Sequence, residues 1–378
     1  MEDNSHIKLG KRVKRNKLFP LRWQSVDAIP PDEPCILALP GSNAKNSKQA
    51  NGFAKMIEET LKKPIIPVYS VEYDFDNRDF RLDREAVLAR YEQGNPNLPF
   101  LREVKEEDKT YIPQYIKELY QMTIAPRLRD ENGARVPMGK AAQRLNMLVF
   151  ANHCQGSTVA QQLEHLMQQD LKDLGYKDSV QAYLLKQVHN VDVAPVSPIG
   201  KTQTTTFKFV SFSDETATSV HTPKVEYILK RKQEHERYLA NIGNISKDKK
   251  LTDDKPFSMN FALFRPTENE TIFAVNNIYP IEIQKDEDYE GIEHVFASYS
   301  DKDDDDRTKQ GDQMSLMFRE LLNRLAQNAK NNEKELTEFP DIFKDKSLKT
   351  SLSQLQNNRY SFITKETKIL KSRKDTTR

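Results

Sequence analysis

Short apolar segments that alternate with helical segments are the feature that most constrains this chain. The apolar runs lie at residues 35–39, 65–69, 146–151, 191–196 and 207–212. Most are bounded by turn residues or polar segments, as is typical of strands buried on both faces. Pro67 weakens the second of them, because proline cannot donate to a sheet. The alternation predicts βαβ units and a mainly parallel sheet flanked by helices on both faces.

Helical spacing of apolar residues fills most of the intervals between these runs. We expect helices over residues 44–61 and 111–124, and a third that starts just after Cys154 and stops near Gly175. Two later elements are also predicted, namely a hairpin with strands at 261–265 and 271–275 and a final helix over 313–325.

The sequence predicts one domain with less regular segments around it. Residues 1–30 carry a basic cluster and predict a solvated N-terminal arm, with contact to an anionic membrane or nucleic acid as the alternative. Residues 31–326 predict an α/β domain with cap-like insertions at about 74–102 and 225–275. Residues 327–378 are polar and predict a partly disordered C-terminal tail.

Charge and cysteine content restrict the class of protein. Lys plus Arg number 58 against 56 for Asp plus Glu, a net charge of +2 that argues against a dedicated nucleic-acid binder. Only Cys35 and Cys154 are present, so a reducing compartment is expected. The first residues lack the apolar core of a secretory signal, and no run approaches the roughly 18 apolar residues of a membrane helix. We therefore expect a cytoplasmic protein, with export independent of an N-terminal signal as the alternative.

The segment around Cys154 predicts a reactive thiol. A buried strand ends at Ala151, the turn Asn152-His153-Cys154-Gln155-Gly156 follows, and a helix begins at once. A sharp strand-to-helix turn lifts its central side chain clear of the sheet and points the helix N-terminus at it. The helix dipole then stabilises a thiolate, which is the nucleophilic form of cysteine.

This turn resembles the G-x-S-x-G nucleophile elbow of the α/β-hydrolase superfamily, with cysteine as the nucleophile. Dienelactone hydrolases are a branch with such a cysteine. Gly156 matches the second glycine of the motif, whereas Asn152 stands where the first glycine is usual. The resemblance covers residues 35 to 325 in element order. It implies an α/β-hydrolase-like sheet and acyl chemistry at Cys154.

The same resemblance implies a catalytic triad in the order nucleophile, acid, histidine. Asp214 follows the 207–212 strand and is the expected acid. His294, which precedes the final helix, is the expected base. The other downstream histidines fit less well, because His221 lies too close to Asp214 in sequence and His235 falls in a charged helix.

The implied oxyanion hole uses the backbone N–H of Gln155 and one from the loop after an earlier strand. Gly41 and Ser42 follow the 35–39 strand and match that loop. Two turns at the ends of two buried strands thus fit one site.

Metal and cofactor patterns are not evident in the sequence. The acidic run at residues 301–306 lacks the glycine and the carboxylate spacing of a calcium loop, and there is no P-loop or dinucleotide fingerprint. We expect no cofactor, and a small-molecule or acyl substrate. The leading hypothesis is a hydrolase or acyl transferase acting on an ester, thioester or amide. The alternative is a non-catalytic binding or secreted effector protein that retains the fold and contacts a protein partner through its terminal segments.

Overall fold

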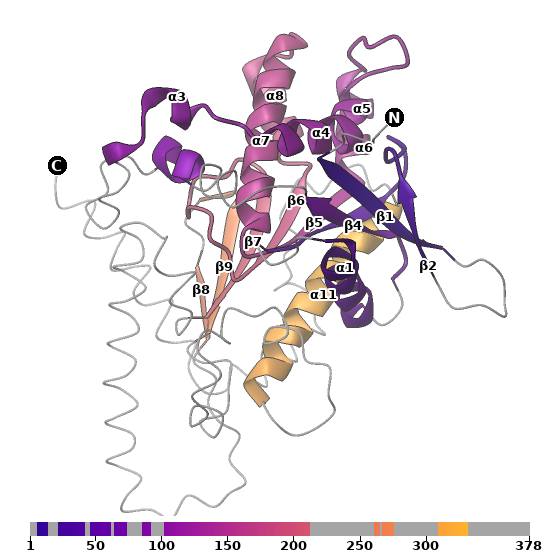
Figure 1. The fold of residues 1–378 in the computed structure, drawn as a ribbon, viewed down its shortest axis with the longest axis vertical. Coiled ribbons are helices and arrows are strands. Elements are labelled where there is room, and N and C mark those ends of the chain that lie inside the picture. Colours follow the sequence, from indigo (N-terminus) through magenta and orange to yellow (C-terminus); the bar gives the residue numbers. More distant parts are fainter. Residues whose placement is uncertain are drawn as a thin grey trace, which may run out of the picture.

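The computed structural model describes the chain in nine segments. They are residues 6–13, 22–41, 46–61, 64–73, 85–91, 102–211, 261–264, 267–275 and 309–331. Figure 1 shows these segments as one sheet with helices on both sides.

A nine-stranded mixed sheet forms the centre of the described structure, in the order β2-β1-β4-β3-β5-β6-β7-β9-β8. Every pairing from β4 to β9 is parallel, whereas β1 pairs antiparallel with β2 and β4, and β8 pairs antiparallel with β9. The mainly parallel sheet predicted from the sequence is confirmed. The strands are β1 (Ile7–Val13), β2 (Arg22–Val26), β3 (Cys35–Leu39), β4 (Val68–Tyr73), β5 (Leu148–His153), β6 (His189–Val193), β7 (Thr205–Ser211), β8 (Phe261–Phe264) and β9 (Glu270–Val275).

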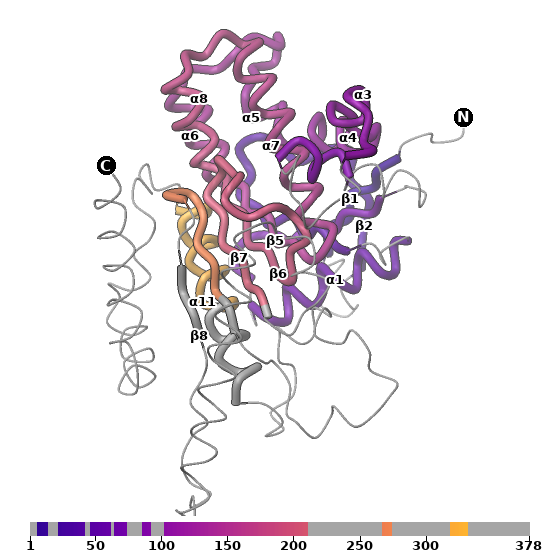
Figure 2. The backbone as a smooth tube through the Cα atoms, turned by 90° about the vertical axis from the view of Figure 1, so that its left-hand side faces the viewer, coloured from indigo at the N-terminus to yellow at the C-terminus, as the bar shows by residue number. Residues whose placement is uncertain are grey.

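Helices cover both faces of the sheet, as Figures 1 and 2 show. One face carries α1 and α11, and the other carries α7 with α4, α5, α6 and α8 around it. The helices are α1 (Ser47–Thr60), α3 (Glu106–Lys109), α4 (Gln114–Thr123), α5 (Ala125–Leu128), α6 (Met138–Asn146), α7 (Gly156–Asp173), α8 (Asp178–Leu185) and α11 (Lys309–Asn331). Residues 85–91 form a further short helix.

Strict alternation along the central strands divides the apolar core between the two faces. In β3, Leu37 and Leu39 join the core beneath α4 and α7, whereas Ile36 and Ala38 join the core beneath α1 and α11. Successive side chains of a strand point to opposite faces, so a central strand needs apolar residues at every position. This explains why the short unbroken apolar runs predicted the sheet.

The N-terminal segment differs from its prediction as a solvated arm. Residues 7–13 and 22–26 form β1 and β2 within the sheet. Ile7 and Leu9 are buried, while Lys11 donates to the hydroxyl of Tyr69 at 3.0 Å and pairs with Glu33. Lys8, Lys11 and Arg12 therefore lie along a strand whose apolar residues reach the core.

The insertion predicted at 225–275 ends in the sheet and not in a cap. The hairpin is confirmed, but β9 pairs parallel with β7, and Phe273 stacks on Phe209 with ring centroids 4.7 Å apart. The rest of that insertion, residues 225–260, lies outside the described residues. At the other end of the predicted domain, α11 continues past residue 326 to Asn331, with Ala329 buried.

The packing of α7 onto the sheet depends on Gly156, the first residue of the helix. A Cβ at this position would lie 2.1 Å from the carbonyl oxygen of Leu39 in β3 and 2.8 Å from its carbonyl carbon. Both of these atoms belong to the backbone of a central strand, which cannot easily move. Only glycine lets α7 approach β3 this closely.

We therefore expect Gly156→Ala to destabilise the protein by about 3 kcal/mol, because the added methyl overlaps backbone atoms. The matched control is Gly139→Ala at the exposed N-terminal end of α6, where an added Cβ meets nothing within 4 Å. That change should be neutral or stabilising by up to about 1 kcal/mol. Urea denaturation of both variants measures the difference, and equal stability of the two variants would contradict the packing argument.

Candidate functional site at the Cys154 turn

The turn predicted at Cys154 is present and strained. β5 ends at His153, Cys154 has a φ of 50°, and α7 begins at Gly156. A positive φ is uncommon for a residue other than glycine and is kept only where neighbouring structure enforces it. The N–H of Cys154 donates to the carbonyl of Val193 at 3.1 Å, and its own carbonyl accepts from the hydroxyl of Ser157 at 2.7 Å. These bonds hold the turn in place.

Gly41 lies directly against this turn. A Cβ built on Gly41 would lie 3.0 Å from the Cβ of Cys154 and 3.2 Å from Nδ1 of His153. The loop after β3 therefore reaches the cysteine, as the sequence predicted for Gly41. Gln155 is buried at the N-terminal end of α7, where the first N–H groups of a helix lack acceptors within the helix.

Three of the predicted site residues lie outside the described residues. These are Ser42 in the loop after β3, Asp214 just after β7, and His294. Their roles stay predictions. Of the described histidines, His189 is buried at the amino end of β6 and bonds through Nε2 to the side-chain oxygen of Asn146 at 2.9 Å. In the parallel pairing it lies beside Val149 at the start of β5, far along the strand from Cys154.

Apolar side chains also pack in a cluster that includes Cys154. Leu88 and Ala89 of helix 85–91 form a buried cluster with Cys154 and Val196, and Val104 packs against it. Cys154 is only 8% exposed. The segment at 74–102, predicted as an insertion near the pocket, thus contributes two residues to the buried cluster that includes Cys154.

A second strained residue lies beside the first one. Ala194 follows β6 with a φ of 47° and donates its N–H to the carbonyl of Phe209 at 3.0 Å. The connection from β6 to β7, residues 194–204, is irregular and largely buried. Buried irregular backbone needs hydrogen-bond partners, because water cannot supply them.

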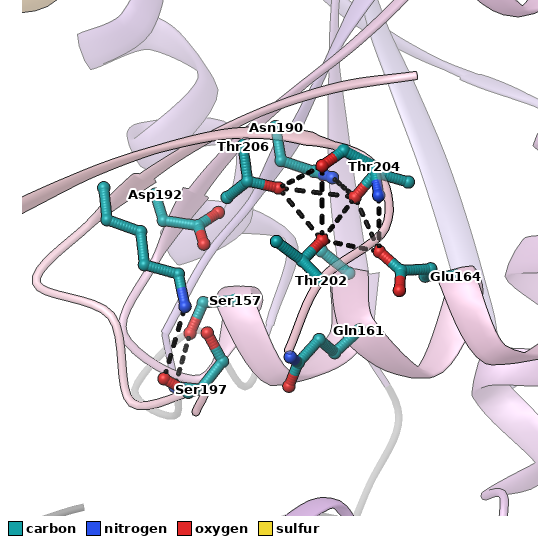
Figure 3. A pocket seen from close by; sticks show the side chains of 11 residues that line it. Ser157, Gln161, Glu164, Asn190, Asp192, Ser197, Thr202, Thr204 and Thr206 are labelled. Carbon is teal, nitrogen blue, oxygen red and sulfur yellow. Dashed lines mark hydrogen bonds between the residues drawn. The ribbon is translucent and has the colours of Figure 1, made fainter. Parts of the chain in front are cut away.

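Polar side chains of α7 accept hydrogen bonds from some of the N–H groups of this connection, as Figure 3 shows. The hydroxyl of Ser157 accepts from the N–H groups of Val196 and Ser197 at 3.1 and 3.2 Å. Glu164 accepts from the backbone N–H of Thr204 at 3.0 Å and from its hydroxyl at 2.7 Å. Ser157 therefore joins the β6–β7 connection to the carbonyl of the cysteine.

A buried ion pair supports the same connection from the sheet side. Lys208 of β7 lies 2.9 Å from Glu270 of β9, and both side chains are almost fully buried. Lys208 donates to the carbonyl of Pro198 at 2.7 Å, and the N–H of Gly200 donates to Glu270. A buried ion pair is tolerated only where such hydrogen bonds offset the loss of hydration.

A small polar cavity lies between α7, β6 and this connection. It leaves about 10 Å³ for the centre of a water-sized sphere, close to what one ordered water needs. The amide of Gln161 points into it (Figure 3), and neither that amide nor the hydroxyl of Ser197 has a hydrogen-bond partner among the described residues.

Asn152 and Asp192 form a buried polar pair next to the turn. The amide of Asn152 in β5 donates to Asp192 in β6 at 2.6 Å. Burial raises the pKa of Asp192 to about 6, although Lys208 and the bond from Asn152 act in the opposite direction. Asn152, which stands where a glycine is usual in the elbow motif, thus has a specific partner on the neighbouring strand.

Sequence reasoning missed this polar group, although a signal was present. Asp192 and Lys208 each interrupt an apolar run, in Val191-Asp192-Val193 and Phe207-Lys208-Phe209. A charged residue between two buried residues of a central strand must itself be buried, and a buried charge needs a partner. Glu270, the partner of Lys208, could not be read from spacing, because folding alone brings the two residues close.

Comparison with known proteins leaves the family open. No model of a known protein family matches the chain, and no curated protein matches it significantly. None of the helices in the described part of the chain combines the length and the hydropathy that a membrane span requires. In the same part of the chain, no group of three or more histidine, cysteine or acidic side chains is arranged to hold a metal ion.

The raised pKa of Asp192 predicts a pH-dependent effect of Asp192→Asn. The folded state keeps the carboxyl proton up to about pH 6, whereas the unfolded chain loses it near pH 4. The contribution of Asp192 to stability therefore falls as pH rises through this window. In Asp192→Asn, residue 192 does not titrate. The free energy of unfolding of this variant should therefore rise by on the order of 2 kcal/mol relative to that of the wild type between pH 4 and 7.

Urea denaturation of both proteins over this pH range gives the difference curve. His189, whose pKa burial lowers to about 4, acts in the opposite sense but equally in both proteins, so it cancels. A difference that is flat, or that falls with pH, would show that Asp192 ionises normally in the folded protein.

Proposed function

We propose that this chain is a hydrolase or acyl transferase of the α/β-hydrolase type, with Cys154 as its nucleophile. The observation that carries the proposal is the conformation of Cys154, a left-handed residue between a central parallel strand and a buried helix. That is the geometry of a nucleophile elbow. The close approach of Gly156 to Leu39 supports it, because an elbow requires a small residue at that position.

The position of Gly41 also supports the proposal. In α/β-hydrolases the oxyanion hole combines the N–H of the residue after the nucleophile with an N–H from the loop after the third strand. Gln155 is the residue after Cys154, and Gly41 in the loop between β3 and α1 lies against the cysteine. We assign Gln155 and the Gly41–Ser42 loop to this role.

The proposed chemistry needs a thiolate and a proton carrier. The sulfur of Cys154 attacks the carbonyl carbon of an ester, thioester or amide, and the carbonyl oxygen becomes an oxyanion held by backbone N–H groups. His294, oriented by Asp214, takes the proton of the Cys154 thiol before the attack. As the intermediate collapses, the leaving group departs with the bonding electron pair and receives that proton from His294. The acyl group stays on the sulfur until water, or an acceptor alcohol or amine, takes it.

A non-catalytic binding or effector protein is the second candidate. The observation that favours it is the low exposure of the thiol beneath Leu88, Ala89 and Val196. In that case the strained turn would be a structural feature, and the protein would act through its surface.

Under the leading proposal the substrate is a small acyl compound, and the protein acts in the cytoplasm or after export without an N-terminal signal.

Thiol labelling tests the proposal. Under the proposal, iodoacetamide should modify Cys154 in the folded protein faster than it modifies Cys35, because an elbow presents the sulfur of its central residue to the substrate. Labelling should be lost in Cys154→Ala and kept in Cys35→Ala. Cys35 is a matched control, because it is fully buried and burial raises its pKa to about 11.

Peptide mass spectrometry after brief labelling assigns the modified residue. If Cys154 and Cys35 react equally slowly in the folded protein, Cys154 is an ordinary buried thiol and the second candidate stands. If Cys154 alone reacts quickly, the nucleophile assignment holds.

A further inference from the structure

The small cavity beside α7 is lined almost entirely by side chains that form hydrogen bonds. These side chains come from α7, β6, β7 and the β6–β7 connection (Figure 3). Of the described residues that line the cavity, only Ala160 is apolar. Cavities that stay empty in proteins are apolar, whereas polar ones of sufficient size hold ordered water. The lining therefore indicates a cavity that is occupied.

Two side chains of this lining have hydrogen-bonding groups to spare. Both amide atoms of Gln161 and the hydroxyl of Ser197 are buried and have no hydrogen-bond partner among the described residues. The two residues are only 5% and 1% exposed. A buried polar group without a partner loses its hydration and gains nothing in return. Gln161 and Ser197 therefore need a partner that is small enough to fit the cavity.

Asp192 lines the same cavity from β6 and is surrounded by charged and polar groups. One of its oxygens accepts from the amide of Asn152 in β5 at 2.6 Å. Lys208 of β7 favours its ionised form, whereas Glu270 of β9 and Glu164 of α7 oppose it. Because Lys208 is also paired with Glu270 at 2.9 Å, it serves two carboxyl groups at once. An ionised Asp192 would therefore gain from any further donor in the cavity.

We propose that the cavity is a binding site for one water molecule, which joins Asp192 of β6 to Gln161 of α7 and Ser197 of the β6–β7 connection. The space for the centre of a water-sized sphere is about 10 Å³, which suits a single water. The three side chains supply the number of partners that a buried water usually has, roughly two to four. A metal ion fits less well, because Lys208 lines the same cavity.

A water at this position serves both protonation states of Asp192. The protonated carboxyl group donates to the water, which donates in turn to the amide oxygen of Gln161. The ionised carboxylate accepts from the water, which then accepts from the amide of Gln161 or the hydroxyl of Ser197. Hydrogen bonds to an ionised group are the stronger ones, so this relay favours loss of the proton.

The relay reaches the strained turn through Ser197. The N–H of Ser197 donates to the hydroxyl of Ser157 at 3.2 Å, and that hydroxyl donates to the carbonyl of Cys154 at 2.7 Å. Loss of the proton from Asp192 therefore changes the hydrogen bonding of the segment that supports the turn. The water site itself does not depend on the chemistry proposed for Cys154.

Carbon-13 NMR of the full chain, labelled at the side-chain carboxyl carbon of aspartate, tests the relay. The resonance that disappears in Asp192→Asn identifies Asp192, and its titration midpoint is expected near pH 6. Gln161→Met keeps the length of the side chain but removes the amide, so the midpoint should rise by about one pH unit. Ser197→Ala, a smaller change that leaves the helix intact, should raise it by roughly half as much.

Gln162→Met is the matched control. Gln162 is fully buried and follows Gln161 in α7, but it does not line the cavity. Its amide is bonded elsewhere, because it accepts from Arg90 at 3.1 Å and donates to the carbonyl of Tyr111 at 3.3 Å. This variant should be less stable than the wild type but should leave the midpoint of Asp192 unchanged.

Oxygen-17 relaxation dispersion, which detects buried water molecules with long residence times, tests the water itself. Its amplitude in Gln161→Met should be lower than in Gln162→Met by about one water molecule. An unchanged midpoint of Asp192 in both Gln161→Met and Ser197→Ala would overturn the relay. A raised midpoint with an unchanged oxygen-17 amplitude would overturn the water site and show that the side chains contact Asp192 directly.

Discussion

The contact between the first turn of α7 and the carbonyl of Leu39 sets the geometry of the described core. Because Gly156 has no side chain, the helix can begin almost on top of β3. The chain must then turn sharply within Cys154 and Gln155, which explains the positive φ of the cysteine. A larger residue at 156 would move the helix away from β3 and remove the need for that strain.

The segment that connects β6 to β7 is buried and irregular and contains no helix. This segment supports the strained turn. That connection lies against α7, where Ser157 and Glu164 accept from its N–H groups. On the sheet side, Lys208 and Glu270 bond to it. Because Ser157 also donates to the carbonyl of Cys154, the polar group and the turn form one hydrogen-bonded unit. This is a physical reason for so many buried polar residues beside a candidate site.

The parts of the fold that sequence could predict are those with an unambiguous period. β3 is apolar at all five positions, and α7 has a glycine at its start and another just after its end, so both were predictable. β1 was not, because its lysine and arginine side chains hide the alternation of Ile7 and Leu9. The ion pair of Lys208 joins β7 to β9, more than 50 residues apart in the chain, and spacing carries no information about such a contact.

The candidate site was predictable only where it is local. The elbow lies within five consecutive residues, and Gly41 follows directly from the end of a predicted strand. Leu88 and Val196 come from segments with no motif, and only the fold places them in one buried cluster with Cys154. Asp214, Ser42 and His294 stay predictions, because they lie outside the described residues.

Trapping of an acyl-enzyme tests the central claim most directly. The protein is mixed with p-nitrophenyl acetate, quenched in acid after a short time, digested and mapped by mass spectrometry. The account predicts one acetyl group on Cys154. In Cys154→Ser, treated in the same way, the acetyl group is either absent or carried by the serine as a stable ester. Acetylation spread over surface lysines, with Cys154 unmodified, would contradict it.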